Sequence, residues 1–86
     1  MEKTIKILFL LNNLILITQI EEVGADIGEP DCKLINPFVV ESNLTLKPFL
    51  CGYTKENTFM MSSDKILTLA DPTPTLLEKY EDLIKG

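Results

Sequence analysis

The densest apolar run of the chain lies close to its start. The 11 residues 7–17 are apolar except for Asn12 and Asn13, and Lys3 and Lys6 precede or border them. A short basic segment followed by an apolar stretch of this length is the order of a secretory signal peptide, and the stretch is shorter than the roughly 20 residues that a membrane-spanning helix needs. The pattern predicts an N-terminal hydrophobic helix that acts as a signal peptide.

Small residues then mark where this signal peptide would end. Val23 and Ala25 occupy the two positions that a signal peptidase reads, so cleavage is expected after Ala25. The chain would divide into a signal peptide, residues 1–25, and a small secreted α+β domain, residues 26–86. The predicted location is extracellular, with only transient membrane contact through the signal peptide.

Two other interpretations of the same run stay open. Residues 4–11, which end at the turn-forming pair Asn12 and Asn13, also have the apolar pattern of a buried first strand. The chain would then be an N-terminal fragment of an intracellular α/β protein. Alternatively, the run stays uncleaved and anchors a small membrane-anchored subunit.

The middle of the chain predicts short antiparallel strands. Its apolar runs are brief and partly β-branched, and Asn, Ser and Pro separate them. Proline cannot donate a hydrogen bond to a strand ladder, so it is expected at strand boundaries. Two of the runs, 58–61 and 65–69, have a polar turn between them and are candidates for a hairpin. The runs in order are 34–35, 38–40, 44–46, 49–50, 58–61 and 65–69.

The C-terminus predicts an amphipathic helix. Thr75 followed by Glu78 has the spacing of a capping box, in which both side chains satisfy amide groups of the first turn. Five apolar residues then recur at helical spacing on one face. Because so short a helix is not stable alone in water, this face must pack against the strands. The five residues are Leu76, Leu77, Tyr80, Leu83 and Ile84.

Two features fit an exported domain. Cys32 and Cys51 are the only cysteines, and a disulfide between them would close a loop of 18 residues, which contributes roughly 3 kcal/mol by chain entropy. Asn43 begins an Asn-Leu-Thr sequon and is the predicted glycosylation site. The predicted fold class is therefore α+β. It consists of antiparallel strands tied by a disulfide, preceded in the chain by the N-terminal hydrophobic helix and followed by the C-terminal helix.

Composition argues against several function classes. The chain has 13 acidic residues against 8 lysines, and neither Arg nor His occurs. Nucleic-acid binding relies on clustered Lys and Arg, so it is not expected. Without His, the common nucleophilic schemes and zinc sites lose their main proton carrier and ligand. We expect no enzymatic activity, no metal site and no cofactor.

A protein partner is the remaining expectation. The predicted function is to bind another protein as a subunit, effector or inhibitor, although the sequence does not identify that protein. Phe59, Met60 and Met61 join an aromatic ring to adaptable thioethers, a composition used at binding surfaces. Leu76 and Tyr80, from the apolar face of the helix, complete the predicted partner-binding set.

Overall fold

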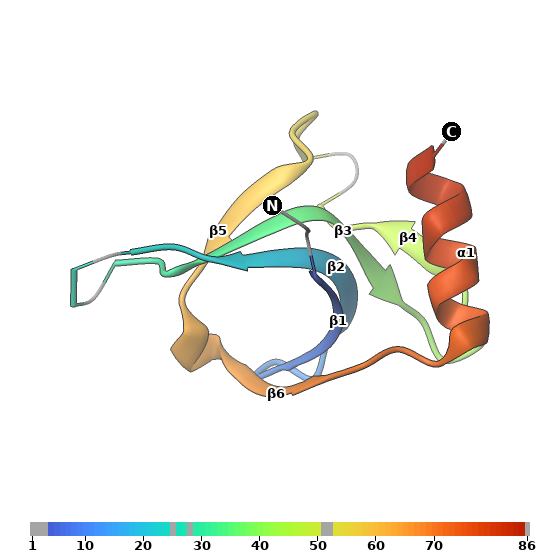
Figure 1. Cartoon of the computed structure of the whole chain (residues 1–86), viewed down its shortest axis with the longest axis horizontal. Helices are drawn as coiled ribbons and strands as arrows, with labels where there is room; N and C mark the ends of the chain where they lie inside the picture. Colours follow the sequence, from blue (N-terminus) through green and yellow to red (C-terminus); the bar gives the residue numbers. More distant parts are fainter. Residues whose placement is uncertain (1–3, 25, 28, 51–52, 86) are drawn as a thin grey trace.

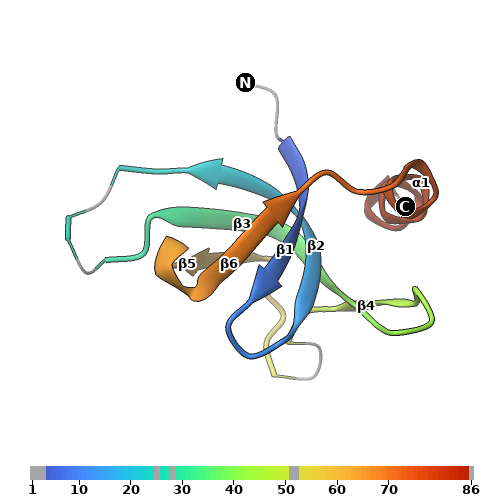
Figure 2. The ribbon, with the colours of Figure 1, turned by 90° about the horizontal axis from the view of Figure 1, so that it is seen from below.

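A curved antiparallel sheet makes up most of the molecule, and a single helix packs on its outside (Figures 1 and 2). The computed structural model describes residues 4–24, 26–27, 29–50 and 53–85. The strands are β1 (Thr4–Leu10), β2 (Ile15–Glu22), β3 (Cys32–Val40), β4 (Leu46–Pro48), β5 (Thr58–Met61) and β6 (Ile66–Ala70). A 3-10 turn, η1 (Ser63–Lys65), joins the last two strands, and α1 (Pro74–Lys85) follows them.

The strand order explains the shape. The sheet has the order β4, β3, β2, β1 and β6. The first half of β3 pairs with β5 and its second half pairs with β4. In Figure 1 the sheet bends so far that β5 and β6, which stand at its two ends, lie on the same open ring. Only residues 62–65 connect them. The result is a small, partly open barrel.

The predicted N-terminal hydrophobic helix is wrong. Residues 4–22 form the hairpin of β1 and β2 in the middle of the sheet. The polar pair that interrupts the apolar run is its turn, because Asn13 has φ 67° and the Asn12 Oδ1 accepts a hydrogen bond from the Leu14 amide at 3.2 Å. The first strand that the second interpretation expected is present as β1, although the sheet is antiparallel rather than α/β.

The predicted disulfide is also wrong. Cys32 is a free, buried thiol at the start of β3, while Cys51 lies outside the described residues. A disulfide is expected if residues 26–86 fold alone, because so short a chain has little core. The core instead draws on the hairpin: Leu8, Leu10 and Leu16 pack with Leu34 inside the barrel.

A second apolar cluster lies on the outer face of the sheet, beneath α1. Ile17 of β2 packs there against Leu76 and Tyr80 of the helix. The predicted C-terminal helix is present, but its start differs from the expectation. The Thr73 hydroxyl, rather than Thr75, accepts a hydrogen bond from the Leu76 amide at 3.3 Å, and Pro74 takes the first helical position, where its missing amide costs nothing.

The dominance of the sheet corrects the predicted fold class as a whole. Six antiparallel strands and one C-terminal helix replace the disulfide-tied domain behind a hydrophobic helix. Among the described residues, no helix is both long enough and apolar enough to cross a membrane.

Candidate functional site

Most of β6 is exposed: four of its five residues are exposed and the fifth is partly buried. The strand pairs with β1 on one side, and within the described residues no strand pairs with its other side, which we call the β6 edge. Leu67 and Leu69 are 54% and 52% exposed. A strand edge with exposed apolar side chains is a template for pairing with another chain. The β6 edge is therefore the first candidate for a functional surface.

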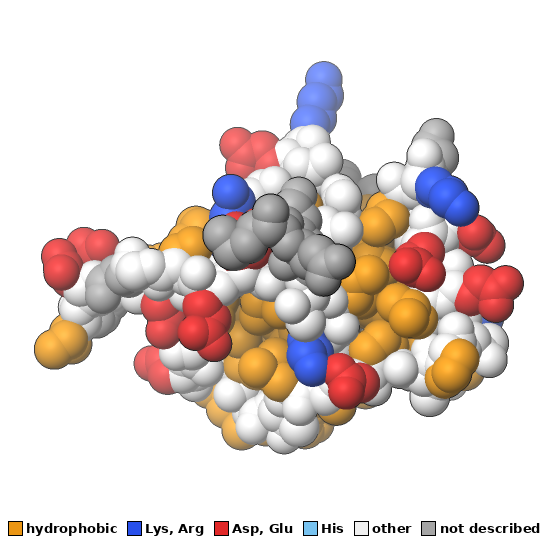
Figure 3. All heavy atoms as spheres, in the orientation of Figure 1, with side chains coloured by type: hydrophobic (Ala, Val, Ile, Leu, Met, Phe, Trp, Pro, Cys, Tyr) orange, Lys and Arg blue, Asp and Glu red, His pale blue; other side chains and the backbone are white. Residues whose placement is uncertain are grey.

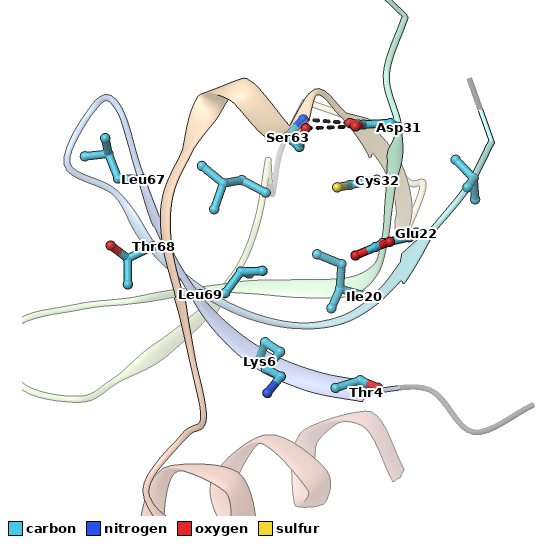
Figure 4. A pocket seen from close by; sticks show the side chains of 12 residues that line it. Thr4, Lys6, Ile20, Glu22, Asp31, Cys32, Ser63, Leu67, Thr68 and Leu69 are labelled. Carbon is cyan, nitrogen blue, oxygen red and sulfur yellow. Dashed lines mark hydrogen bonds between the residues drawn. The ribbon is translucent and has the colours of Figure 1, made fainter. Parts of the chain in front are cut away.

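A bulge accounts for the position of Leu67. In the β1–β6 ladder Thr68 lies opposite Phe9 and Ile66 lies opposite Leu10, so Leu67 has no partner in the register. A bulge of this kind redirects the extra side chain and increases the local twist. Figure 4 shows Leu67 and Thr68 on the outer side of the strand, whereas Leu69 points inward.

β6 forms one wall of a cavity at the open end of the barrel. The cavity measures about 670 Å³. Residues of β1, β2, β3 and β6 line it. Ile20, Ile66 and Leu69 contribute apolar side chains, and Figure 4 shows Leu69 and Ile20 pointing toward each other. Glu22 and Asp31 lie on the wall that faces β6. Apolar walls with a few polar groups are the usual composition of a binding cavity.

Asp31 ties the start of β3 to the turn that leads into β6. Its carboxylate accepts hydrogen bonds from the Ser63 amide at 2.7 Å and from the Ser63 hydroxyl at 2.8 Å (Figure 4). These bonds, the hydroxyl first, favour the charged form and lower the pKa of Asp31 below its usual value. The mouth of the cavity therefore carries a fixed negative charge.

The neighbouring Cys32 is poorly suited to act as a nucleophile. Burial disfavours its thiolate, and the nearby charges of Asp31 and Glu22 add to the effect, so the pKa of the thiol is raised. Only the thiolate is strongly nucleophilic, and reactive cysteines sit in positive surroundings. Cys32 thus contributes a neutral, weakly polar surface to the cavity.

A second, smaller hollow adjoins the cavity and is acidic. It measures about 330 Å³ and shares Asp31 and Ser63 with the first. Three more carboxylates line it, those of Asp26, Glu29 and Asp64. In Figure 3, acidic side chains lie on both sides of the apolar surface in the lower part of the view. Across the described part of the chain, no three His, Cys, Asp or Glu side chains gather closely enough to hold a metal ion.

The helix α1 covers a second bulge of the sheet, which lies between β2 and β3. Between β2 and β3 the register shifts, and the backbone of Asn36, with φ 52°, departs from the ladder. The Tyr80 hydroxyl donates to the Asn36 carbonyl at 2.8 Å and lies 3.2 Å from the Ile35 carbonyl, and it accepts from the Gln19 amide at 3.2 Å. Burial raises the pKa of Tyr80 to about 12.

The residues predicted to bind a partner therefore divide into two groups. Leu76 and Tyr80 are only 8% and 0% exposed, because they hold α1 on the sheet. In β5, Met60 is 49% exposed, while Met61 packs against the inner core and the Phe59 ring meets Phe49 edge-on, with centroids 5.6 Å apart. Of the five, Met60 offers the most apolar surface to solvent.

The predicted glycosylation site lies in the exposed turn between β3 and β4. The Asn43 Oδ1 accepts a hydrogen bond from the Thr45 amide at 3.2 Å, and Asn43 itself is exposed. Glycosylation of Asn43 and secretion of the chain stay predictions.

Sequence reasoning missed the residues of the cavity mouth. Leu67 and Leu69 have the pattern of an ordinary hairpin strand, and nothing in the pattern indicates a bulge. Asp31 and Ser63 are 32 positions apart, and they meet only because β3 and η1 close the same end of the barrel. The one usable signal is local: a polar Ser-Ser-Asp turn separates two short apolar runs.

Comparison with known proteins relates nearly the whole chain to a family. A search of curated proteins finds no match. Residues 3–85 match the family described as "Family of unknown function (DUF6561)". The matched range includes every strand of the barrel and the C-terminal helix. The chain therefore belongs to this family, DUF6561.

Proposed function

We propose that this chain is a non-enzymatic module that binds another protein through the β6 edge and the adjoining cavity. The observation that carries the proposal is the exposure of Leu67 and Leu69, two leucines on a strand that pairs on one side. Full burial of a leucine side chain is worth about 1.5–3 kcal/mol, so a partner that covers this edge gains binding energy that folding leaves unused.

The chemistry of the cavity supports a binding role over a catalytic one. The pKa of the Cys32 thiol is raised, which keeps the thiol protonated near neutral pH. The chain contains no His to act as a general base in that range. Asp31 is held by Ser63 and stays ionised, so it is suited to attract a positive group rather than to transfer a proton.

Site-specific photo-crosslinking in the native cell tests this proposal. A photoreactive amino acid replaces Leu67 in the full chain, and the same amino acid replaces Glu81 on the exposed side of α1 as the matched control. We expect one protein to be crosslinked from position 67 and not from position 81. Identical adducts from both positions, or none from position 67, would overturn the proposal.

A further inference from the structure

The chemistry of the partner can be inferred from the same surface, and this inference rests on the proposed function. We propose that the partner segment is an extended peptide that combines apolar residues with lysine or arginine, and that it adds to the β6 edge as a further strand. Three observations support it: within the described residues no strand pairs with one side of β6, a cavity lies beside this strand, and acidic side chains lie at the mouth of the cavity.

The backbone of β6 suits strand addition. Its five residues, Ile66–Ala70, would pair with a peptide segment of similar length, which spans about 17 Å when extended. In this mode the main-chain hydrogen bonds supply affinity, and alternate side chains of the peptide reach opposite faces of the sheet. One set would enter the cavity beside Leu69, and the other would lie on the outer side with Leu67 and Thr68 (Figure 4).

The cavity favours apolar side chains on the inward set. Ile20, Ile66 and Leu69 line it, and the buried Cys32 adds a neutral thiol. Its volume of about 670 Å³ has room for more than one side chain of a peptide. A peptide whose inward residues are apolar would remove both its own apolar surface and the exposed part of Leu69 from water.

The charges at the mouth favour a positive peptide. Within the described ranges the ion pairs are Lys6 with Asp71, at 2.5 Å, and Lys47 with Glu41, at 3.9 Å. Lys6, the lysine on the cavity wall, is thus already matched, whereas neither pair uses Glu22 or Asp31. The acidic hollow of Asp26, Glu29 and Asp64 extends the negative surface beyond Asp31.

The same charge argues against a second copy as the occupant. Each copy carries a net charge of −5, so two copies repel each other as they approach. A basic peptide instead gains from complementary charge in its rate of association and in specificity. The occupant that fits both the apolar cavity and the acidic mouth is a foreign segment of basic and apolar residues.

Binding of defined peptides to the full chain, followed by the shifts of its amide signals in NMR, tests this inference. Three capped eight-residue peptides serve as probes: one with four central Val residues and two Lys residues at each end, so that one Lys of each pair faces the side of the cavity mouth, the same peptide with Glu in place of Lys, and the Val-Lys peptide with proline at one central position. We expect the Val-Lys peptide to shift the amides of residues 66–70 and to bind at least about tenfold more tightly than the Val-Glu peptide at low salt. The proline peptide should bind far more weakly, because proline cannot donate to the ladder.

Matched variants locate the charge. Glu22 is exposed, so Glu22→Gln should fold normally and weaken Val-Lys binding about threefold at low salt. Glu81→Gln, on the far surface of α1, should leave it unchanged. Equal effects of the two variants, or shifts spread over α1, would overturn the inference as nonspecific attraction. Concentration-dependent shifts of residues 66–70 without any peptide would overturn it in favour of a second copy.

The outcomes also separate this inference from the proposed function. If position 67 crosslinks one protein but the three peptides bind alike, protein binding stands and the basic, extended partner is wrong. If neither crosslinking nor peptide binding involves β6, both proposals fail.

Discussion

The described strands contain two bulges, which differ in how the rest of the chain packs on them. At the β2–β3 bulge, Tyr80 of α1 lies fully buried and bonds the displaced backbone groups. At the β1–β6 bulge, Leu67 turns outward and is 54% exposed. The first irregularity is completed within the chain, and the second is left open. This difference indicates that the first bulge stabilises the fold, and under our proposal the second is the one that a partner covers.

Removal of residues 1–25 should have the largest effect on this comparison, because both bulges involve strands of the first hairpin. The truncated chain lacks β1 and β2, which supply Leu8, Leu10 and Leu16 to the inner core. We expect it to have no cooperative unfolding transition, measured by circular dichroism against the full chain. A cooperative transition in residues 26–86 would contradict the central place of the hairpin and favour the domain boundary that the sequence predicts.

The second prediction concerns the packing at the sealed bulge. Tyr80→Ala should lower the free energy of unfolding by about 3–5 kcal/mol, the usual cost of removing a buried aromatic side chain. Urea denaturation measures this change. Tyr53, which is 87% exposed, provides the matched control, and Tyr53→Ala should change stability by less than about 0.5 kcal/mol. Similar losses from both variants would mean that α1 does not complete the sheet.

Tyr80→Phe keeps the ring and isolates the hydroxyl. Three backbone groups, those of Gln19, Ile35 and Asn36, would lose their contact with the hydroxyl, so we expect a loss of about 1–3 kcal/mol at neutral pH. Urea denaturation with Tyr53→Phe as control measures it. An unchanged stability would show that the bulge does not depend on this hydroxyl.

The same variant carries a pH signature. In the folded chain the pKa of Tyr80 is raised from 10 to about 12, so its stabilising effect is complete below pH 10 and is lost as pH rises through 12. A shift of this size corresponds to about 2–3 kcal/mol. The stability difference between the original chain and Tyr80→Phe should therefore close between pH 10 and 12. A constant difference across that range would contradict the buried, neutral hydroxyl.

How far the sequence predicts the molecule depends on the range of the interactions. The strand character of 58–61 and 65–69 and the helix at the C-terminus follow from local patterns, and both are present as β5, β6 and α1. The run 7–17 does not by itself distinguish a helix from a buried hairpin, because a short apolar stretch fits both, and only the pairing of β1 with β2 separates them.

The candidate site was beyond local reasoning for the same reason. The composition predicts that Met60 and Tyr80 bind a partner; Met60 is exposed, but Tyr80 is buried and contacts the bulge at Asn36. The contact of Asp31 with Ser63 and the outward turn of Leu67 depend on closure of the barrel and on register. Neither property can be read from neighbouring residues.

The smallest expected effect on stability lies at the open bulge. Leu67→Thr introduces a β-branched side chain, which suits a strand, and removes apolar surface that is already half in water, so the free energy of unfolding should change by less than about 0.5 kcal/mol. The same variant should weaken capture of the partner, measured by crosslinking from position 69. A loss of more than about 1 kcal/mol would place Leu67 in the core. In that case both bulges would stabilise the fold, and the proposal that the β6 edge is the binding surface would be wrong.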